Sequence, residues 1–355
     1  MNTALEQAYC QIEARFDRLD FSALFRGFHR FPFALYDDSH AFINGKTIDK
    51  PAGFLGNTSV KYNGEYTAIW KLEEGAQDWD VLASKLVHEM LHAFQNASGE
   101  TRWADEREAL AKYRYDETNF SVKLTEADCM RHCLTEHSSE DFERLLRLRR
   151  ARRERFPYEY DYEARIEQIE GTANHIELAA LKQLDETKAK QRWEALFTDL
   201  SDPSRYFPVR AVTYLSGAAM IACLREYTDM VTDSFIDVPF SVEAIANVQP
   251  CQLPENDAGV TKCLSDWQDR SRKKVEQALK KGELVLNGEY RLIGWNVYDS
   301  VRCGKYAILS VFIGYIEGAA LPQTDEELFA KMKVLNGDFV AKLDDSLRLY
   351  RVWRQ

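Results

Sequence analysis

The sequence lacks any run of about eighteen apolar residues, the length that a membrane-spanning helix needs, so we expect no membrane span. Its first residues contain no basic stretch followed by an apolar core, so we expect no secretory signal. Cysteine is scarce, with seven among 355 residues, an odd number at scattered positions. Such usage is typical of a reducing compartment rather than of a disulfide framework, and we therefore expect a cytoplasmic protein.

Basic residues are fewer than acidic ones: the chain has 46 Lys and Arg and 57 Asp and Glu, which gives a formal net charge of −11. An acidic chain is a poor partner for nucleic acid, and we expect none. Residues 144–155 oppose this trend, since seven arginines crowd into them. We interpret the segment as the solvated face of a helix that buries Leu145, Leu146 and Leu148, and the alternative is a dock for an anionic partner. The arginines are Arg144, Arg147, Arg149, Arg150, Arg152, Arg153 and Arg155.

The length of the chain exceeds what one small core needs and suits two or three packed subdomains. The residue patterns predict a predominantly helical α+β fold. Residues 1–100 should form an N-terminal part with a small β-sheet and the helix of the motif described below, and residues 101–281 a helical lobe. Residues 282–355 turn to β-patterns and predict a C-terminal α+β subdomain.

The N-terminal part opens with a helical pattern over 4–28 and a strand over 31–36. Two β-rich runs, 58–62 and 66–70, flank Asn63-Gly64-Glu65. Asn-Gly between such runs is a strong hairpin signal.

The helical lobe is predicted from apolar spacing, and the tail from alternating strands. The expected helices are 103–114, 125–136, 139–154, 160–185, 188–198 and 208–230, followed by an irregular stretch over 237–260 and a helix over 261–281. In the tail we expect strands at 283–295, 298–303 and 306–315, a helix at 324–334 and one last strand or extended segment at 338–353.

The most informative motif is His88-Glu89-Met90-Leu91-His92. Two histidines four apart share one face of a helix, so their imidazoles can bind one metal ion while Glu89 reaches a water on it. Asp78 or Asp80 should cap this helix, and Ser98-Gly99 should end it. Histidine is rare in this chain, and a chance HExxH is expected in roughly one such sequence in a hundred.

Two histidines do not complete a catalytic zinc site, which usually takes a third protein ligand and keeps one position for water. Glu170 is the leading candidate, because Gly171 follows it inside a helical pattern. Glycine inside a helix lowers helix stability by about 1 kcal/mol relative to alanine, so its presence needs an explanation, such as the close approach of another helix. Gly171 and Ala173 would press this helix against the motif helix. The alternative third ligands are Glu106, Glu108, Glu163 and Glu167.

Two further polar residues, Asn174 and Glu177, project from nearly the same helix face as Glu170. They could orient His88 or His92 through the ring nitrogen that does not bind metal.

The pattern His88-Glu89-x-x-His92 followed by Glu170 on a later helix resembles the gluzincins, the thermolysin-like superfamily of zinc peptidases. The resemblance covers roughly residues 55–230, and its specific part is short. It implies an active-site helix packed on a small β-sheet, then a helical lobe that supplies the glutamate. The chain departs from the family in the long interval between His92 and Glu170, which requires an inserted helical segment, and in lacking the Gly-Ala-Met-Glu-Asn signature of the gluzincin aminopeptidases.

The expected activity is hydrolysis of a peptide or protein substrate with Zn²⁺ held by His88, His92 and Glu170 and with Glu89 as the general base. The tetrahedral intermediate needs a hydrogen-bond donor for its oxyanion. Tyr214 is our candidate donor and Arg210, four residues earlier, a candidate substrate or supporting contact.

Other interpretations stay open at this point. Tyr214 could equally be a buried aromatic residue, and His175 is a weaker candidate donor. Cys129 and Cys133 around His132 lack the spacing of a zinc knuckle. The alternative functions are a non-catalytic binding protein on a peptidase-like scaffold, with a structural or vestigial metal site, and a helical protein with a chance motif. The histidines expected to be structural or at the surface are His29, His40, His132 and His137.

Overall fold

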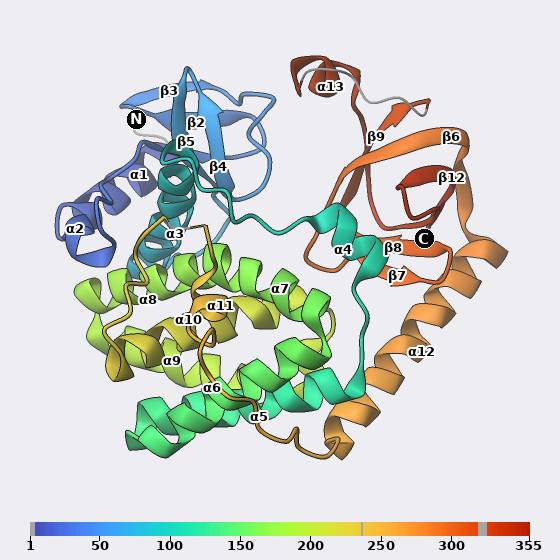
Figure 1. Cartoon of the computed structure of the whole chain (residues 1–355). Helices are drawn as coiled ribbons and strands as arrows, with labels where there is room; N and C mark the ends of the chain where they lie inside the picture. Colours follow the sequence, from blue (N-terminus) through green and yellow to red (C-terminus); the bar gives the residue numbers. More distant parts are fainter. Residues whose placement is uncertain (1–3, 236, 319–324) are drawn as a thin grey trace.

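The computed structural model describes residues 4–235, 237–318 and 325–355. It is predominantly helical with two β-sheets, which confirms the predicted α+β class. Figure 1 shows three regions: a blue sheet with its helices, a green and yellow helical lobe below it, and an orange to red sheet that α12 connects to the lobe. Among the described residues, none of the helices has the length and apolar character that crossing a membrane requires.

The N-terminal region packs three helices against a five-stranded sheet of order β3-β2-β1-β5-β4. Strand β1 runs parallel to β5, and all other neighbours are antiparallel. The predicted hairpin at Asn63-Gly64 is confirmed, with positive φ at both residues. The elements are α1 (Ala4–Phe16), α2 (Phe21–Leu24), β1 (Phe33–Tyr36), β2 (His40–Ile43), β3 (Lys46–Asp49), β4 (Thr58–Tyr62), β5 (Glu65–Lys71) and α3 (Trp79–Ala97).

The helical lobe follows the predicted order of helices with shifted boundaries. The second predicted helix begins eight residues earlier than expected, because Asp116 caps it by accepting hydrogen bonds from the backbone N–H groups of Thr118 and Asn119. The stretch over 237–260 is irregular as expected, apart from one short helix, α11. The elements are α4 (Glu106–Lys112), α5 (Glu117–Glu136), α6 (Ser139–Arg155), α7 (Pro157–Ile166), η1 (Glu167–Gly171), α8 (Thr172–Leu184), α9 (Glu186–Leu200), η2 (Pro203–Tyr206), α10 (Val209–Tyr227) and α11 (Phe240–Glu243).

The helix predicted over 160–185 is continuous in direction but contains one π-helical turn, η1, between α7 and α8. A π-turn inserts an extra residue into the α-helical ladder and shifts the side chains that follow it. Three acidic side chains of this stretch, Glu163, Glu167 and Glu170, lie on one side of it and enter two different buried clusters.

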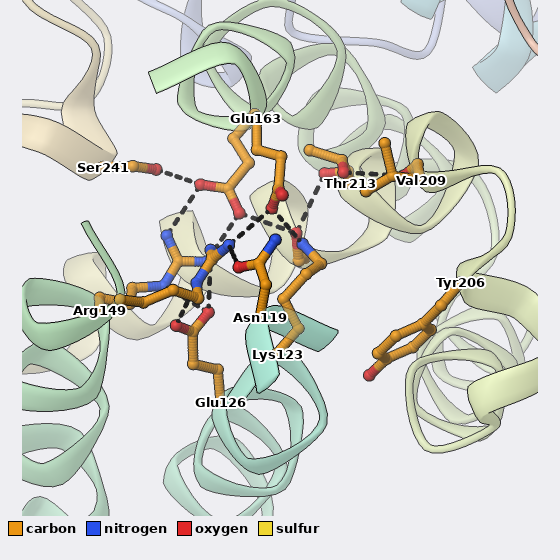
Figure 2. A network of polar contacts seen from close by, with 12 residues as sticks. Asn119, Lys123, Glu126, Arg149, Glu163, Tyr206, Val209, Thr213 and Ser241 are labelled. Carbon is orange, nitrogen blue, oxygen red and sulfur yellow. Dashed lines mark hydrogen bonds and ion pairs between the residues drawn. The ribbon is translucent and has the colours of Figure 1, made fainter. Parts of the chain in front are cut away.

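The first cluster is a network of six charged side chains between α5, α6 and the α7–η1 stretch (Figure 2). Each of the six is at most 4% exposed, so the network is part of the core of the lobe. Three carboxylates face three cations, and the charges therefore balance. The members are Lys123, Glu126, Arg149, Arg152, Glu163 and Glu167.

Paired hydrogen bonds hold the network together. Arg149 donates to both carboxylate oxygens of Glu167, at 2.7 and 2.8 Å. Arg152 donates to both oxygens of Glu126, at 2.8 and 3.3 Å, and to Glu163 at 2.9 Å. Burial is the largest influence on the pKa of Glu163 and of Glu167 and raises both, but the neighbouring cations outweigh it and hold both pKa values at about 2.

The prediction that the arginine-rich segment is a solvated helix face is wrong for Arg149 and Arg152, which are 0% and 1% exposed. Leu145 and Leu148 are buried beside them as expected, so α6 turns a mixed apolar and cationic face inward. The outer face is solvated, and there Arg153 pairs with Asp161 at 2.8 Å. Buried carboxylates on α5 and α7–η1 are the reason that the arginines turn inward, and local periodicity does not reveal them.

The C-terminal region begins with α12, which packs against α5 and against strands β7, β8, β11 and β12 of an antiparallel sheet of order β10-β9-β6-β12-β11-β8-β7. The single last strand predicted over 338–353 is wrong, because a turn at Asp344 splits it into a hairpin. Asp344 Oδ1 accepts hydrogen bonds from the backbone N–H groups of Ser346 and Arg348. The predicted helix over 324–334 begins outside the described residues. The elements are α12 (Ala258–Lys281), β6 (Glu283–Trp295), β7 (Val301–Cys303), β8 (Tyr306–Leu309), β9 (Phe312–Glu317), α13 (Asp325–Lys331), β10 (Lys333–Asn336), β11 (Phe339–Leu343) and β12 (Arg348–Arg354).

Candidate metal centre

Helix α3 carries the motif and has the predicted boundaries. The Asp78 side chain accepts hydrogen bonds from the backbone N–H groups of Asp80 and Val81, at 3.1 and 3.2 Å. The helix ends at Ala97, and Ser98 is its C-cap. Most of its apolar side chains face α1, the sheet and α8, which fixes the rotation of the helix and therefore the direction of the motif histidines.

His88 and His92 lie one helical turn apart with their rings 4.8 Å from each other. The two Nε2 atoms are 3.1 Å apart. Glu170 Oε2 lies 3.2 Å from Nε2 of His92 and 3.6 Å from Nε2 of His88. The structure thus brings the three predicted ligands together, and one donor atom from each lies within 4.8 Å of the others.

Glu170 is presented by the π-turn η1 rather than by a regular helix. Next to it, Gly171 touches α10: a Cβ built on Gly171 would lie 2.6 Å from Cα of Gly217, too close for any side chain. The prediction of a close helix contact at Gly171 is therefore right, but its partner is α10 and not the motif helix. Ala173 is the residue that packs in the cluster of apolar side chains around α3.

The alternative third ligands occupy other places. Glu106 contacts Arg210 and accepts a hydrogen bond from the hydroxyl of Tyr162 at 3.0 Å, while Glu108 pairs with Lys112 at the surface. The remaining two alternatives, Glu163 and Glu167, belong to the buried ionic network.

A second layer of polar groups contacts the outer nitrogens of the two imidazoles. Glu177 Oε2 lies 3.3 Å from Nδ1 of His88, a contact with the geometry of an ion pair rather than of an aligned hydrogen bond. Gln95 Oε1 lies 2.8 Å from Nδ1 of His92. The predicted orienting role thus fits Glu177, whereas within the described chain Asn174 makes no hydrogen bond to either ring and lines a groove between α8 and α9 instead. Such contacts fix the tautomer and direction of a ligating histidine.

Several carboxylates surround the two histidines, so negative charge is in excess at the centre. Glu89 is 9% exposed, and its pKa is raised by burial first and also by the carboxylates of Glu170 and Glu177, against the opposing effect of the histidines. Burial lowers the pKa of His88, but the carboxylates of Glu170 and Glu177 beside its two ring nitrogens outweigh this effect and raise that pKa to about 10. The carboxylates therefore attract positive charge to the place where the imidazole nitrogens meet.

Arg210 and Tyr214 lie on α10 beside the centre. Arg210 donates to Glu170 Oε1 at 3.1 Å and also contacts Glu106, so it holds the face of Glu170 that points away from the histidines. Its guanidinium carbon lies 5.4 Å from the ring centroid of Tyr214. Tyr214 is 7% exposed, and the charge of Glu170 acts on its pKa, which burial raises above the ordinary value. The structure thus places both predicted residues next to the third ligand.

Two aromatic residues near the centre were missed by the sequence reasoning. The Trp103 ring lies 6.4 Å from that of His92, with its indole N–H donating to the backbone oxygen of Glu100 at 2.8 Å. The Tyr298 ring lies 5.4 Å from that of Tyr214. The sequence contained a signal for Trp103, because this residue closely follows the motif helix. It contained none for Tyr298, which belongs to a loop far away along the chain.

The remaining histidines and cysteines lie apart from the centre. His175 ties α8 to α10 through contacts with the Ala218 carbonyl and with Arg225, and burial followed by the charge of Arg225 lowers its pKa to about 3. Cys129 and Cys133 are buried and free, and the described residues around His132 form no group of metal ligands. His29, His40, His132 and His137 sit at or near the surface, as expected.

No protein-family model matches this chain, and neither a curated protein nor a solved structure matches it.

Proposed function

We propose that this protein is a zinc-dependent peptidase related to the gluzincins. The observation that carries the proposal is the meeting of His88, His92 and Glu170 within 4.8 Å, with the acidic residue Glu89 on the same helix between the two histidines. A purely structural metal site has no use for a buried acid beside the metal, whereas a hydrolase needs one as a base.

The donor set fits zinc. Two imidazoles and one carboxylate are the protein ligands of many catalytic zinc sites. Two Nε2 atoms 3.1 Å apart, both directed at one carboxylate oxygen, make an arrangement that a cation between them would satisfy. Bound zinc would lower the pKa of a water molecule toward about 7 and polarise the substrate carbonyl.

The residues of this chain would perform the proton transfers. Glu89 takes up the proton of the attacking water and passes it to the leaving amine, and a pKa raised by burial brings it closer to the range that such transfers require. Tyr214 donates a hydrogen bond to the developing oxyanion. Arg210 positions Glu170 by binding the oxygen that faces away from the histidines.

The fold supports the relation to the gluzincins in outline. A small sheet packs on the motif helix, and a helical lobe supplies the acidic ligand, as that family arranges them. The long interval between His92 and Glu170 is filled by α4 to α7 and the start of η1, and it contains all six members of the buried ionic network. We also propose a cytoplasmic location, because all seven cysteines are free.

The test is metal analysis and peptide hydrolysis on purified protein. Glu89→Gln should retain one zinc per chain and lose roughly 10²- to 10⁴-fold in hydrolysis of a peptide library, since only the base is removed. His92→Ala should lose the metal, and His137→Ala, which changes an exposed histidine just after the end of α5, should keep both metal and activity.

The outcomes separate the possible functions. Hydrolysis that a chelator abolishes and added zinc restores supports the peptidase. Stoichiometric zinc without hydrolysis of any peptide would favour a binding protein on a peptidase-like scaffold. The assignment of the site fails if wild-type protein holds no metal at any pH near neutral.

A further inference from the structure

The loop between β6 and β7, residues 296–300, extends from the C-terminal region to the candidate centre. Val297 and Ser300 line the same small cavity as Arg210 and Glu106, the two side chains that lie behind Glu170. This cavity has a volume of only about 40 Å³, which is too small for a substrate residue. The loop is therefore packed on the helical lobe beside the centre.

Hydrogen bonds within the C-terminal region hold the loop in this shape. The Asn296 side chain accepts from the backbone N–H of Tyr298 at 3.2 Å and donates to Asp299 and Ser310 at 3.1 and 3.0 Å. Ser310 in turn donates to the second carboxylate oxygen of Asp299 at 2.8 Å. A loop braced in this way presents Tyr298 in one position.

Tyr298 combines contact with the centre and access to solvent. Its ring lies against that of Tyr214, yet the residue is 47% exposed, whereas Tyr214 is 7% exposed. Tyr214 in turn lies 5.4 Å from the guanidinium carbon of Arg210, which binds Glu170, so contacts through Tyr214 and Arg210 connect Tyr298 to the centre. Burial and the charges of Glu170 and Glu89 raise the pKa of Tyr298 to about 12, and the hydroxyl therefore stays protonated and able to donate.

We propose that Tyr298 is a substrate-contacting residue of this centre, supplied by the C-terminal region: its ring forms a wall of the substrate site and its hydroxyl donates to a carbonyl oxygen of a bound peptide. The proposal rests on the peptidase function proposed above. It gives the C-terminal region a role in binding substrate, and it makes the orientation of Tyr214 depend on that region.

The test uses the zinc-loaded full chain and a peptide that the wild type hydrolyses. Tyr298→Phe removes one neutral hydrogen bond and should raise KM roughly 3- to 10-fold, with kcat within about 2-fold, because the contact is made in the ground state as well as in the transition state. Tyr298→Ala also removes the ring and should raise KM roughly 10- to 100-fold. Zinc stoichiometry should not change in either variant.

Two variants in the same region are matched controls. Tyr350→Phe also removes a tyrosine hydroxyl, one that donates to Asp344 in the turn between β11 and β12. Leu284→Ala truncates a side chain with the same 47% exposure as Tyr298. Both should hydrolyse the peptide like the wild type, and Tyr298 variants indistinguishable from these controls overturn the proposal.

A binding experiment separates this proposal from the proposed catalysis. A peptide hydroxamate, which chelates zinc and carries a peptide backbone, is titrated calorimetrically into zinc-loaded Glu89→Gln protein with and without Tyr298→Phe. Binding weakened roughly 3- to 10-fold by Tyr298→Phe supports the contact even if the wild type hydrolyses nothing, an outcome that rejects only catalysis. Binding that does not depend on Tyr298 overturns the contact alone, and no binding by zinc-loaded protein overturns both.

Discussion

Two buried polar clusters lie within a few residues of each other on the α7–η1–α8 stretch, and they differ in how their charges are matched. Glu163 and Glu167 enter a network in which three carboxylates face three cations. Glu170, only three residues later, enters a group in which four carboxylates surround one guanidinium, that of Arg210, and the two imidazoles; the carboxylates are those of Glu89, Glu106, Glu170 and Glu177. The side chains of the centre are somewhat more exposed, at 14% for Glu170 and 16% for Glu177 against at most 4% in the network, and the larger difference is in charge balance.

The balanced network has the character of a structural element. Its carboxylates receive paired hydrogen bonds from buried guanidinium groups, and serine hydroxyls on α10 and α11 fill further acceptor positions of Glu167. A buried charge costs free energy unless partners of this kind surround it. The charges of this cluster are therefore matched within the protein.

In the proposed function, a cation would complete the unbalanced group. Its two imidazoles point their Nε2 atoms at the same carboxylate oxygen, and the pKa values of His88 and Glu89 are both raised, so that positive charge is favoured and negative charge disfavoured there. The comparison of these adjacent clusters shows that burial of a carboxylate does not by itself indicate a ligand site. A buried carboxylate indicates such a site when the neighbouring groups leave its charge unmatched.

Replacing one glutamate by glutamine in each cluster should give the largest difference in the free energy of unfolding. Glu167→Gln leaves Arg149 buried without its main counter-charge and should lower the free energy of unfolding by about 3–5 kcal/mol. Glu89→Gln removes a carboxylate whose charged form burial disfavours, and in metal-free protein it should cause no loss of stability. Urea denaturation in the presence of chelator measures both. Equal losses in the two variants would contradict the distinction.

The second contrast is the response to metal. Zinc at 100 times its dissociation constant should stabilise the wild type by about 2.7 kcal/mol, because it binds the folded state. His92→Ala should show no such gain, whereas the destabilised Glu167→Gln should keep it, since its ligands are intact. Thermal melts with and without zinc measure the shift. A zinc-dependent gain that persists in His92→Ala would place the metal elsewhere.

Sequence alone was sufficient for the parts of this comparison that depend on local geometry. The spacing of His88, Glu89 and His92 on a helix follows from 3.6 residues per turn, and Gly171 pointed to Glu170 because glycine is costly inside a helix. The caps, the Asn63-Gly64 hairpin and the helical lobe also follow from local signals.

Sequence was insufficient where partners are distant along the chain. Arg149 and Arg152 were assigned to a solvated face because their carboxylate partners lie on other helices, and periodicity within α6 does not reveal them. For the same reason the partner of Gly171 was placed on α3 instead of α10, and Tyr298 was not found at all. Tertiary packing determines these contacts, and the residue pattern of a single helix or loop does not reveal them.

The glycine contact between the two clusters is the third place to test. A Cβ on Gly217 would lie 2.8 Å from the Cα atoms of both Glu167 and Gly171, so Gly217→Ala must push η1 away from α10. We expect a loss of about 1–3 kcal/mol in unfolding free energy and weaker zinc binding, because Glu170 moves with η1. Urea denaturation and zinc titration measure the two effects.

The matched control for this contact is Gly53→Ala, where a new Cβ meets nothing within 4 Å. It should leave both zinc affinity and stability close to those of the wild type. If Gly217→Ala lowers stability but leaves zinc affinity unchanged, the contact supports the lobe without positioning Glu170.

The most gradual expected effect is the acid sensitivity of the balanced network. The pKa values of Glu163 and Glu167 are about 2 in the folded chain against an ordinary value of 4.5, so their contribution is complete above pH 4.5 and is lost as the pH falls toward 2. Each carboxyl can add at most about 1.4 kcal/mol per pH unit to that decline. Glu167→Gln should therefore show a shallower loss of stability across this window in metal-free protein, while Asp161→Asn, which alters an ion pair at the surface, should follow the wild type. Identical slopes in all three proteins would show that the network does not hold its carboxyls in the charged form, and the contrast with the metal centre would then have to rest on geometry alone.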